Sequence, residues 1–158
     1  MSRLPALGPR GEGWVVLQFV LLGLVAVAGL AGPAWGGAAR IVTTALGVAS
    51  MAAGAVLAFR GLVDLREALT PLPHPRDGAS LVDTGSYRLV RHPIYGGIVI
   101  GATGYGLVTA SPLAIVGAAA LLGFFRLKSA REEVWLEQRY PGYPAYRLRT
   151  RRMIPFLY

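Results

Sequence analysis

Two polar segments of the chain hold most of the side chains that could do chemistry. Residues 78–95 read GASLVDTGSYRLVRHPIY, and residues 126–133 read RLKSAREE. Together they contribute Tyr87, His92, Tyr95, Lys128, Glu132 and Glu133. Aromatic faces attract onium groups, and carboxylates accept hydrogen bonds from hydroxyl or ammonium groups. A pocket built from both segments would therefore match a ligand with a purine, a ribose diol and a fixed positive charge.

Each of these residues also has a purely structural interpretation. The His-Pro pair at residues 92–93 is typical of a helix start, where proline is common. Tyr87 and Tyr95 are candidates for aromatic anchors at a membrane interface. Lys128 and Glu132 are four residues apart and can form an ion pair on a helix surface. Taken one at a time, these structural interpretations are favoured. Whether the residues form a binding site therefore depends on whether the fold brings the two segments together.

The composition of the 158-residue chain indicates a membrane protein with a single domain over residues 1–158. Hydrophobic residues make up 54% of it and charged residues only 15%, whereas soluble domains carry about 25% charged residues. The stretches 13–39, 41–59 and 93–125 contain no charged residue. As one helix the third would be about 50 Å long, too long for about 30 Å of hydrocarbon. We divide it at Ser111-Pro112, which predicts spans at about 14–32, 41–59, 95–110 and 112–127, the last continuing as a cytosolic helix.

The basic residues support this topology. Of the sixteen Lys and Arg residues, only Arg40 lies outside when both termini are cytoplasmic, as the positive-inside rule requires. Arg3 and Arg10 precede the first span, which is too long for a cleaved signal peptide. The sequence therefore predicts an all-α, polytopic protein of the inner (plasma) membrane. Its net charge of +8 follows from topology, so no nucleic-acid partner is expected, and with no cysteine and two histidines no metal site is expected.

The third and fourth spans form a hairpin, so their two cytosolic ends must lie close together. His92 and Tyr95 at one end would thereby approach Lys128 and Glu132 at the other. The proline-rich run at residues 70–76 between the second and third spans cannot be helical. Small residues recur at four-residue spacing in the second and third spans, which favours close helix packing over a cofactor-binding loop. They are Ser50, Gly54 and Ala58, and then Gly97 and Gly101.

The order and spacing of these residues resemble a known enzyme superfamily. Residues 81–97 read LVDTGSYRLVRHPIYGG, a hydrophobic hairpin follows, then Arg131-Glu132-Glu133, and the tail over 140–156 reads YPGYPAYRLRTRRMIPF. Over about residues 79–156 the chain is similar to the isoprenylcysteine carboxyl methyltransferase and phospholipid methyltransferase superfamily of integral membrane enzymes. The first two spans match only as generic apolar helices.

The resemblance implies that S-adenosylmethionine binds at the cytosolic end of the hairpin, under a lid made by the inter-span connection and the tail, with S-adenosylhomocysteine as product. The residues that would hold it are Ser80, Leu81, Val82, Tyr87, His92, Pro93, Ile94, Tyr95, Glu132 and Glu133. Lys128 stands where the carboxyl methyltransferases place an arginine near the substrate carboxylate. Arg126 and Arg91 would help to position the substrate, and no general base is assigned. Lysine lacks the bidentate fork of arginine, so this position departs from the pattern of the carboxyl methyltransferases.

The function that this implies is methyl transfer to a lipophilic acceptor entering from the bilayer, most like carboxyl O-methylation of the isoprenylcysteine type. A second candidate is N-methylation of a phospholipid headgroup, where His92 or Glu132 would accept a proton from the amine. A third, of another class, is a non-catalytic four-span protein or transporter, which the lack of a charged residue in the stretches 13–39, 41–59 and 93–125 disfavours. The arginines of the tail either bind anionic membrane lipids or enforce topology. The oligomeric state stays open.

Overall fold

The computed structural model describes residues 5–155, so Arg3 and Phe156 of the sequence predictions lie outside the described residues. Within this range the fold is all-α, as predicted, and its one strand-like pairing is an isolated parallel bridge between Val90 and Arg151. The elements in chain order are α1 (Glu12–Ala31), α2 (Ala39–Leu65), η1 (Arg66–Ala68), η2 (Gly85–Arg88), α3 (Pro93–Val108), α4 (Pro112–Arg139) and α5 (Tyr143–Arg149).

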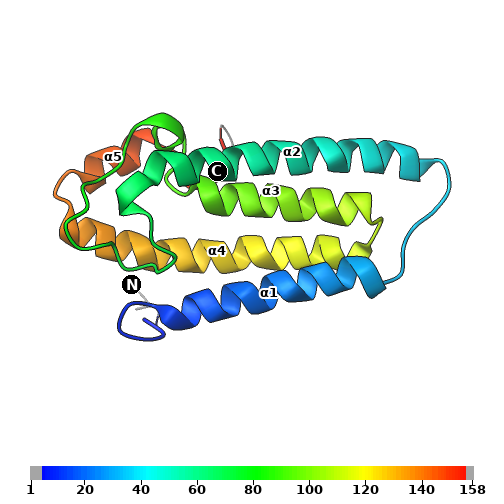
Figure 1. Cartoon of the computed structure of the whole chain (residues 1–158), viewed down its shortest axis with the longest axis horizontal. Helices are drawn as coiled ribbons and strands as arrows, with labels where there is room; N and C mark the ends of the chain where they lie inside the picture. The colour runs from blue at the N-terminus through cyan, green and yellow to red at the C-terminus, as the bar shows by residue number, and fades with distance from the viewer. Residues whose placement is uncertain (1–4, 156–158) are drawn as a thin grey trace.

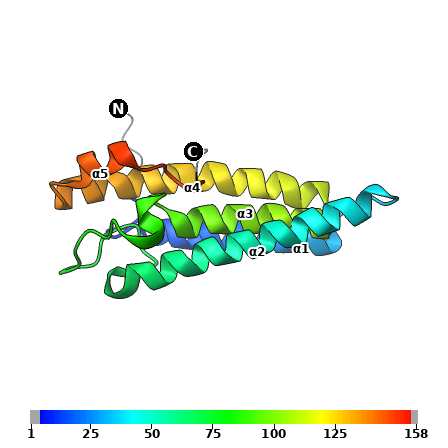
Figure 2. The same cartoon turned by 90° about the horizontal axis from the view of Figure 1, so that it is seen from above.

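The four long helices run antiparallel in the spatial order α2, α3, α4, α1 (Figure 1). The most extensive packing joins α2 to α3, and α4 packs on both α3 and α1. The row of helices is curved. Figure 2 shows that α1 and α2 are both displaced to the same side of α4. The end of α2, the start of α3 and the last turns of α4 meet beside α5 and the connection over residues 66–92 (left in Figure 1). We call this the polar end of the bundle.

Three of the helices, α1, α2 and α4, are long and apolar enough to cross a membrane. α3 has 16 residues and is shorter than these, so the fourth span remains a prediction. α2 extends past the expected end of the second span to Leu65, because Arg60 ends the apolar stretch without ending the helix. α4 continues to Arg139, in agreement with the expected helical extension. Large apolar side chains such as Val27 and Val56 are exposed on α1 and α2, as on helices that face lipid.

The turn between α3 and α4 falls where the sequence predicts it. α3 ends at Val108, and Pro112 begins α4. The Ser111 side chain caps α4 by accepting from the backbone N–H of Ala114 at 3.2 Å, which satisfies one of the free donors of a helix start. The Ser111 hydroxyl also donates to the carbonyl oxygen of Ala28 in α1 at 2.8 Å. The turn therefore ties the hairpin to the first helix.

The small residues of α2 and α3 form a packing seam, as predicted. A Cβ added at Gly54 would lie 2.5 Å from the carbonyl oxygen of Gly97 and 2.6 Å from the backbone nitrogen of Gly101. The hydroxyl of Ser50 donates to the carbonyl oxygen of Ile100 at 2.8 Å. The two backbones are thus too close to admit a side chain at this crossing.

We expect Gly54→Ala to lower the thermal unfolding temperature in detergent, because backbone atoms of α3 cannot yield as a flexible side chain would. The overpacking cost is about 1–3 kcal/mol. The matched control is Gly23→Ala on α1, where an added Cβ meets nothing within 4 Å. The control should unfold at the wild-type temperature or above it. Equal unfolding temperatures for both variants would contradict the packing role of Gly54.

Candidate functional site

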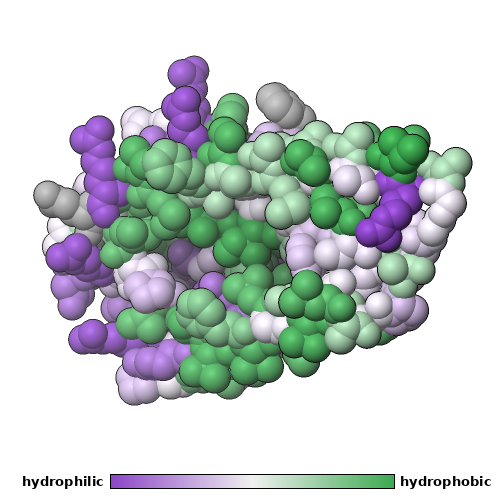
Figure 3. All heavy atoms as spheres, turned by 45° about the vertical axis from the view of Figure 1, so that its right-hand side comes forward, coloured by the Kyte–Doolittle hydropathy of each residue, from purple (hydrophilic) through white to green (hydrophobic). Residues whose placement is uncertain are grey.

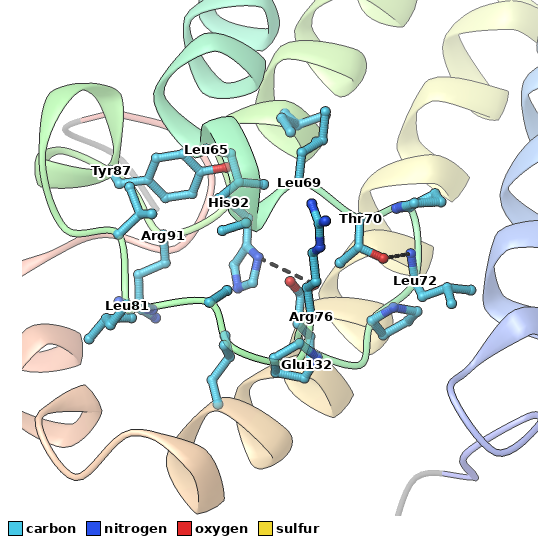
Figure 4. A pocket seen from close by; sticks show the side chains of 18 of the residues that line it. Leu65, Leu69, Thr70, Leu72, Arg76, Leu81, Tyr87, Arg91, His92 and Glu132 are labelled. Atoms are coloured by element: carbon cyan, nitrogen blue, oxygen red, sulfur yellow. Dashed lines mark hydrogen bonds and ion pairs between the residues drawn. The ribbon is translucent and has the colours of Figure 1, made fainter.

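A cavity of about 370 Å³ lies at the polar end of the bundle. Helices α1, α2, α3 and α4 contribute to its walls, together with the connection over residues 68–82 and the tail tyrosines. Figure 4 shows this connection curving around the cavity, with His92 and Glu132 facing each other inside it. Ten of the thirteen predicted site residues line the cavity: Ser80, Leu81, Val82, Tyr87, Arg91, His92, Ile94, Tyr95, Lys128 and Glu132.

The carboxylate of Glu132 contacts side chains at the start of α3. Tyr95 donates its hydroxyl to Oε2 of Glu132 at 2.9 Å, and Nδ1 of His92 lies 3.7 Å from the same oxygen. The rings of His92, Tyr95 and Phe125 form a stacked column, with centroid distances of 5.4 Å and 4.6 Å. The side chain of His92 makes no cap hydrogen bond, and its imidazole lies instead between the carboxylates of Glu132 and Glu133. The hairpin therefore brings together the residues that the sequence placed at its two ends.

Glu133 is 3% exposed and does not line the cavity. Its Oε1 accepts from Nε of Arg91 at 2.9 Å and lies 3.2 Å from Nε2 of His92. Its Oε2 accepts from a guanidinium nitrogen of Arg152 at 3.2 Å. Consecutive helix residues differ by about 100° in direction, which explains why Glu132 faces the cavity and Glu133 does not. The sequence predicts Glu133 beside the ligand, together with Glu132. In the structure its carboxylate lies outside the cavity wall, against Arg91 and Arg152.

Two other predicted residues also lie off the cavity wall. Pro93 is buried at the first position of α3, where a Cβ added at Gly61 of α2 would meet its ring at 2.9 Å. Arg126 is exposed on α4, two residues before Lys128 and hence on the opposite side of the helix. Arg91 does line the cavity, but its guanidinium is held by Glu133 and by the carbonyl oxygen of Thr150, at 2.6 Å.

Lys128 is 1% exposed, although a lysine is seldom fully buried. Its ammonium donates to Oε1 of Gln18 in α1 at 2.6 Å and lies 5.0 Å from the ring centroid of Tyr95. Lys128 and Glu132 are four residues apart, but they do not form the surface ion pair that this spacing allows. The buried cation instead faces the cavity wall made by α1 and α3.

The tail closes the site from the outside. Backbone N–H groups of Arg91 and His92 donate to the carbonyl oxygens of Arg151 and Arg152, each at 2.9 Å. Tyr146 donates its hydroxyl to the carbonyl oxygen of Tyr87 at 2.7 Å. Burial raises the pKa of Tyr87 and Tyr146 above that of an ordinary phenol, so both hydroxyls remain donors. The tail and the connection thus form one hydrogen-bonded cover.

Several lining residues were not among the individual site residues predicted from the sequence. They are Gln18 and Phe19 of α1, the segment 68–76 with its prolines, and the tail tyrosines Tyr140, Tyr143 and Tyr146. The prolines offered a signal, because they exclude a helix over this part of the connection. Gln18 offered another, as a lone polar side chain within an apolar span.

The cavity has room and chemistry for a nucleoside-like onium ligand. Its volume falls within the range of about 300–1,000 Å³ for small-molecule sites. Leu81, Val82 and Ile94 supply apolar wall, and Glu132 supplies a carboxylate. Among the residues described, the buried hydroxyl of Tyr143 has no hydrogen-bond partner, and Tyr143 lines the cavity. Apolar walls, aromatic rings and one carboxylate are the groups that suit an adenosine and a sulfonium, so the residues present fit S-adenosylmethionine.

The chain matches the model of one protein family and is similar to two named plant proteins. The family model described as phospholipid methyltransferase matches residues 42–142, which is well over half of the chain. Proteins of Oryza sativa subsp. indica and subsp. japonica, each named "Probable protein-S-isoprenylcysteine O-methyltransferase", are 34% identical over 86 residues. That match covers 53% of this chain and 45% of each relative, so it spans less than half of the relatives' length.

Proposed function

Because this chain belongs to the phospholipid methyltransferase family, we propose that it transfers a methyl group from S-adenosylmethionine to a lipophilic acceptor at the cytosolic face of the membrane. The observation that carries this proposal is the convergence of Glu132, His92 and Tyr95 in one cavity beside the buried Lys128. These residues come from both ends of the helical hairpin. They combine the acidic and aromatic groups that suit an onium donor with a cation that suits an acceptor.

S-adenosylmethionine supplies, when bound, an electrophilic methyl group on a sulfonium sulfur. Glu132 holds a polar end of the donor, and the rings of Tyr87 and Tyr95 provide aromatic walls. Residues 80–82 also line the cavity and would contact the donor through their backbone. Lys128 positions the acceptor. Alignment of two reactants in this way is worth about 7–11 kcal/mol of the barrier.

The acceptor has an apolar route to the cavity. Gln18 of α1 and Tyr95 of α3 line the cavity, and one turn farther along the same two helices a shallow groove begins. The groove is lined by Leu22, Val25, Ala26, Ile98, Gly101, Ala102 and Tyr105. Figure 3 shows a hollow on the flank of the molecule, with hydrophobic side chains around it and hydrophilic residues deeper inside. This arrangement supports an acceptor whose apolar tail stays in the bilayer while its polar end reaches the site.

A carboxylate acceptor is favoured over an amine by the charge at the site. A carboxylate is already ionised, so its methylation needs no general base. An ammonium headgroup would be repelled by Lys128 and would first have to lose a proton, for which His92 and Glu132 are the nearby acceptors. N-methylation of a phospholipid is therefore the second candidate.

The test is a calorimetric titration of the purified protein with S-adenosylhomocysteine, followed by incubation with S-adenosylmethionine labelled in its methyl group and extracted membrane lipids. We expect saturable binding and label in the lipid-soluble fraction. Label released by alkali as volatile methanol indicates an ester, whereas alkali-stable label indicates N-methylation. Absence of both binding and transfer would overturn the proposed function.

A further inference from the structure

The first helix reaches the cavity although it precedes the family-matched segment, which starts at residue 42. Gln18 and Phe19 of α1 line the cavity. Between Trp14 and Ala31, Gln18 is the only residue with a hydrogen-bonding side chain. Polar residues inside membrane-spanning helices are costly and commonly mark function. Gln18 therefore needs an explanation beyond the packing of α1 on α4.

The hydrogen bond from Lys128 to Gln18 gives the buried cation a neutral partner. Buried charges in proteins are usually paired with an opposite charge. Among the side chains that the structure describes (residues 5–66 and 68–155), however, no carboxylate oxygen lies within 4 Å of the Lys128 ammonium. The acid one turn away, Glu132, accepts instead from Tyr95 and faces His92. Glu132 attracts the charge of Lys128 from a distance, but the ammonium forms no ion pair with a described carboxylate.

Gln18 and Lys128 together offer mainly hydrogen-bond donors. An ammonium has three N–H groups, of which one is directed at Oε1 of Gln18, and the amide of Gln18 has two N–H groups of its own. A cluster of donors with one positive charge complements an anionic oxygen. The same cluster disfavours a cationic acceptor, because like charges would meet in a buried site.

Resting on the function proposed above, we propose that Gln18 is a specificity-determining residue: it holds Lys128 as a cation whose hydrogen-bond partner is neutral and, with it, selects an acceptor that carries a carboxylate. Gln18 acts by fixing the ammonium without neutralising it. A carboxylate at this position would complete an ion pair inside the protein and remove the charge that the acceptor needs. α1 is then part of the acceptor site and not only a membrane anchor.

The test is Gln18→Glu, which keeps the shape of the side chain and supplies that internal counter-ion. With N-acetyl-S-farnesylcysteine as acceptor, we expect KM to rise about 10- to 150-fold, the range for losing a hydrogen bond to a charged group, with kcat little changed. Equilibrium binding in the presence of S-adenosylhomocysteine gives a second readout. The wild type should prefer the acid over its carboxamide, and Gln18→Glu should lose this preference. Val20→Ala, on an exposed residue of the same helix, is the control and should behave as the wild type.

The possible failures can be told apart. If the wild-type protein neither binds S-adenosylhomocysteine nor transfers methyl, the proposed function is wrong. If it methylates the acid and Gln18→Glu retains both KM and the preference, only the assignment of Gln18 is wrong. Transfer to phosphatidylethanolamine but not to the acid would also overturn it. Should Gln18→Glu not fold, Gln18→Asn shortens the amide by one methylene and must raise the same KM; an unchanged KM overturns the inference.

Discussion

Glu132→Gln should lower the affinity for S-adenosylhomocysteine by about 10- to 150-fold and abolish methyl transfer. The substitution keeps the shape of the side chain but removes the charge that accepts the Tyr95 hydroxyl and faces His92. Hydrogen bonds to charged groups contribute about 1.5–3 kcal/mol, and each 1.4 kcal/mol is a factor of about ten. Calorimetric titration measures the affinity directly. His92→Ala should weaken the same binding, because it removes the imidazole from the cavity wall.

The matched control for Glu132 is Glu137→Gln, on the same helix. Glu137 lies outside the cavity wall and pairs with Arg147 at the surface, at 2.5 Å. Its affinity for S-adenosylhomocysteine should match that of the wild type. The unfolding temperature of Glu132→Gln should also stay near the wild-type value. Wild-type affinity in both Glu132→Gln and His92→Ala would show that the ligand binds elsewhere.

Glu133→Ala should have the opposite profile, with its largest effect on stability. The carboxylate of Glu133 lies against Arg91, His92 and Arg152 and is almost fully buried. Removing one partner from a buried ion pair costs about 3–5 kcal/mol, because the remaining charge is left uncompensated. We expect a marked fall in the unfolding temperature in detergent. The tail after Tyr146 should also become sensitive to added protease, because Arg91 and Arg152 would lose their shared anchor.

Glu137→Ala serves as the comparison for Glu133. It also removes an ion pair of α4, but an exposed one, and such pairs contribute about 0–1 kcal/mol. Its unfolding temperature should therefore change little. If Glu133→Ala unfolds at the same temperature as Glu137→Ala, the cluster around Glu133 does not hold the tail in place.

The placement of the site at the ends of the hairpin was predictable from the sequence. The uncharged stretch from Pro93 to Phe125 is too long for one span, and Ser111-Pro112 marks the turn. An antiparallel pair of helices then has to bring His92 close to Glu132. This inference uses only helix length and turn chemistry, which are local properties of the chain, and the structure confirms the proximity.

The separate orientations of Glu132 and Glu133 could not be predicted in the same way. Their order in the sequence is known, but the rotation of α4 about its axis is set by packing on α3 and α1. The contribution of Gln18 was missed for a related reason, because nothing local indicates which side of α1 meets α4. Likewise, the contact between the tail and residues 87–92 depends on backbone pairing over a long sequence separation. Such contacts follow from the assembled fold and not from any short motif.

The spatial order of the helices has a consequence for biogenesis. α1 and α2 leave the ribosome first, but their main partners, α4 and α3, are synthesised later. The nascent chain must therefore hold two apolar helices in the membrane before either has gained its final neighbour. The hairpin of α3 and α4 then inserts between α2 and α1. Only this insertion brings Lys128 into contact with Gln18 and completes the walls of the cavity. A chain stalled before residue 112 would be inserted in the bilayer but would lack that cavity.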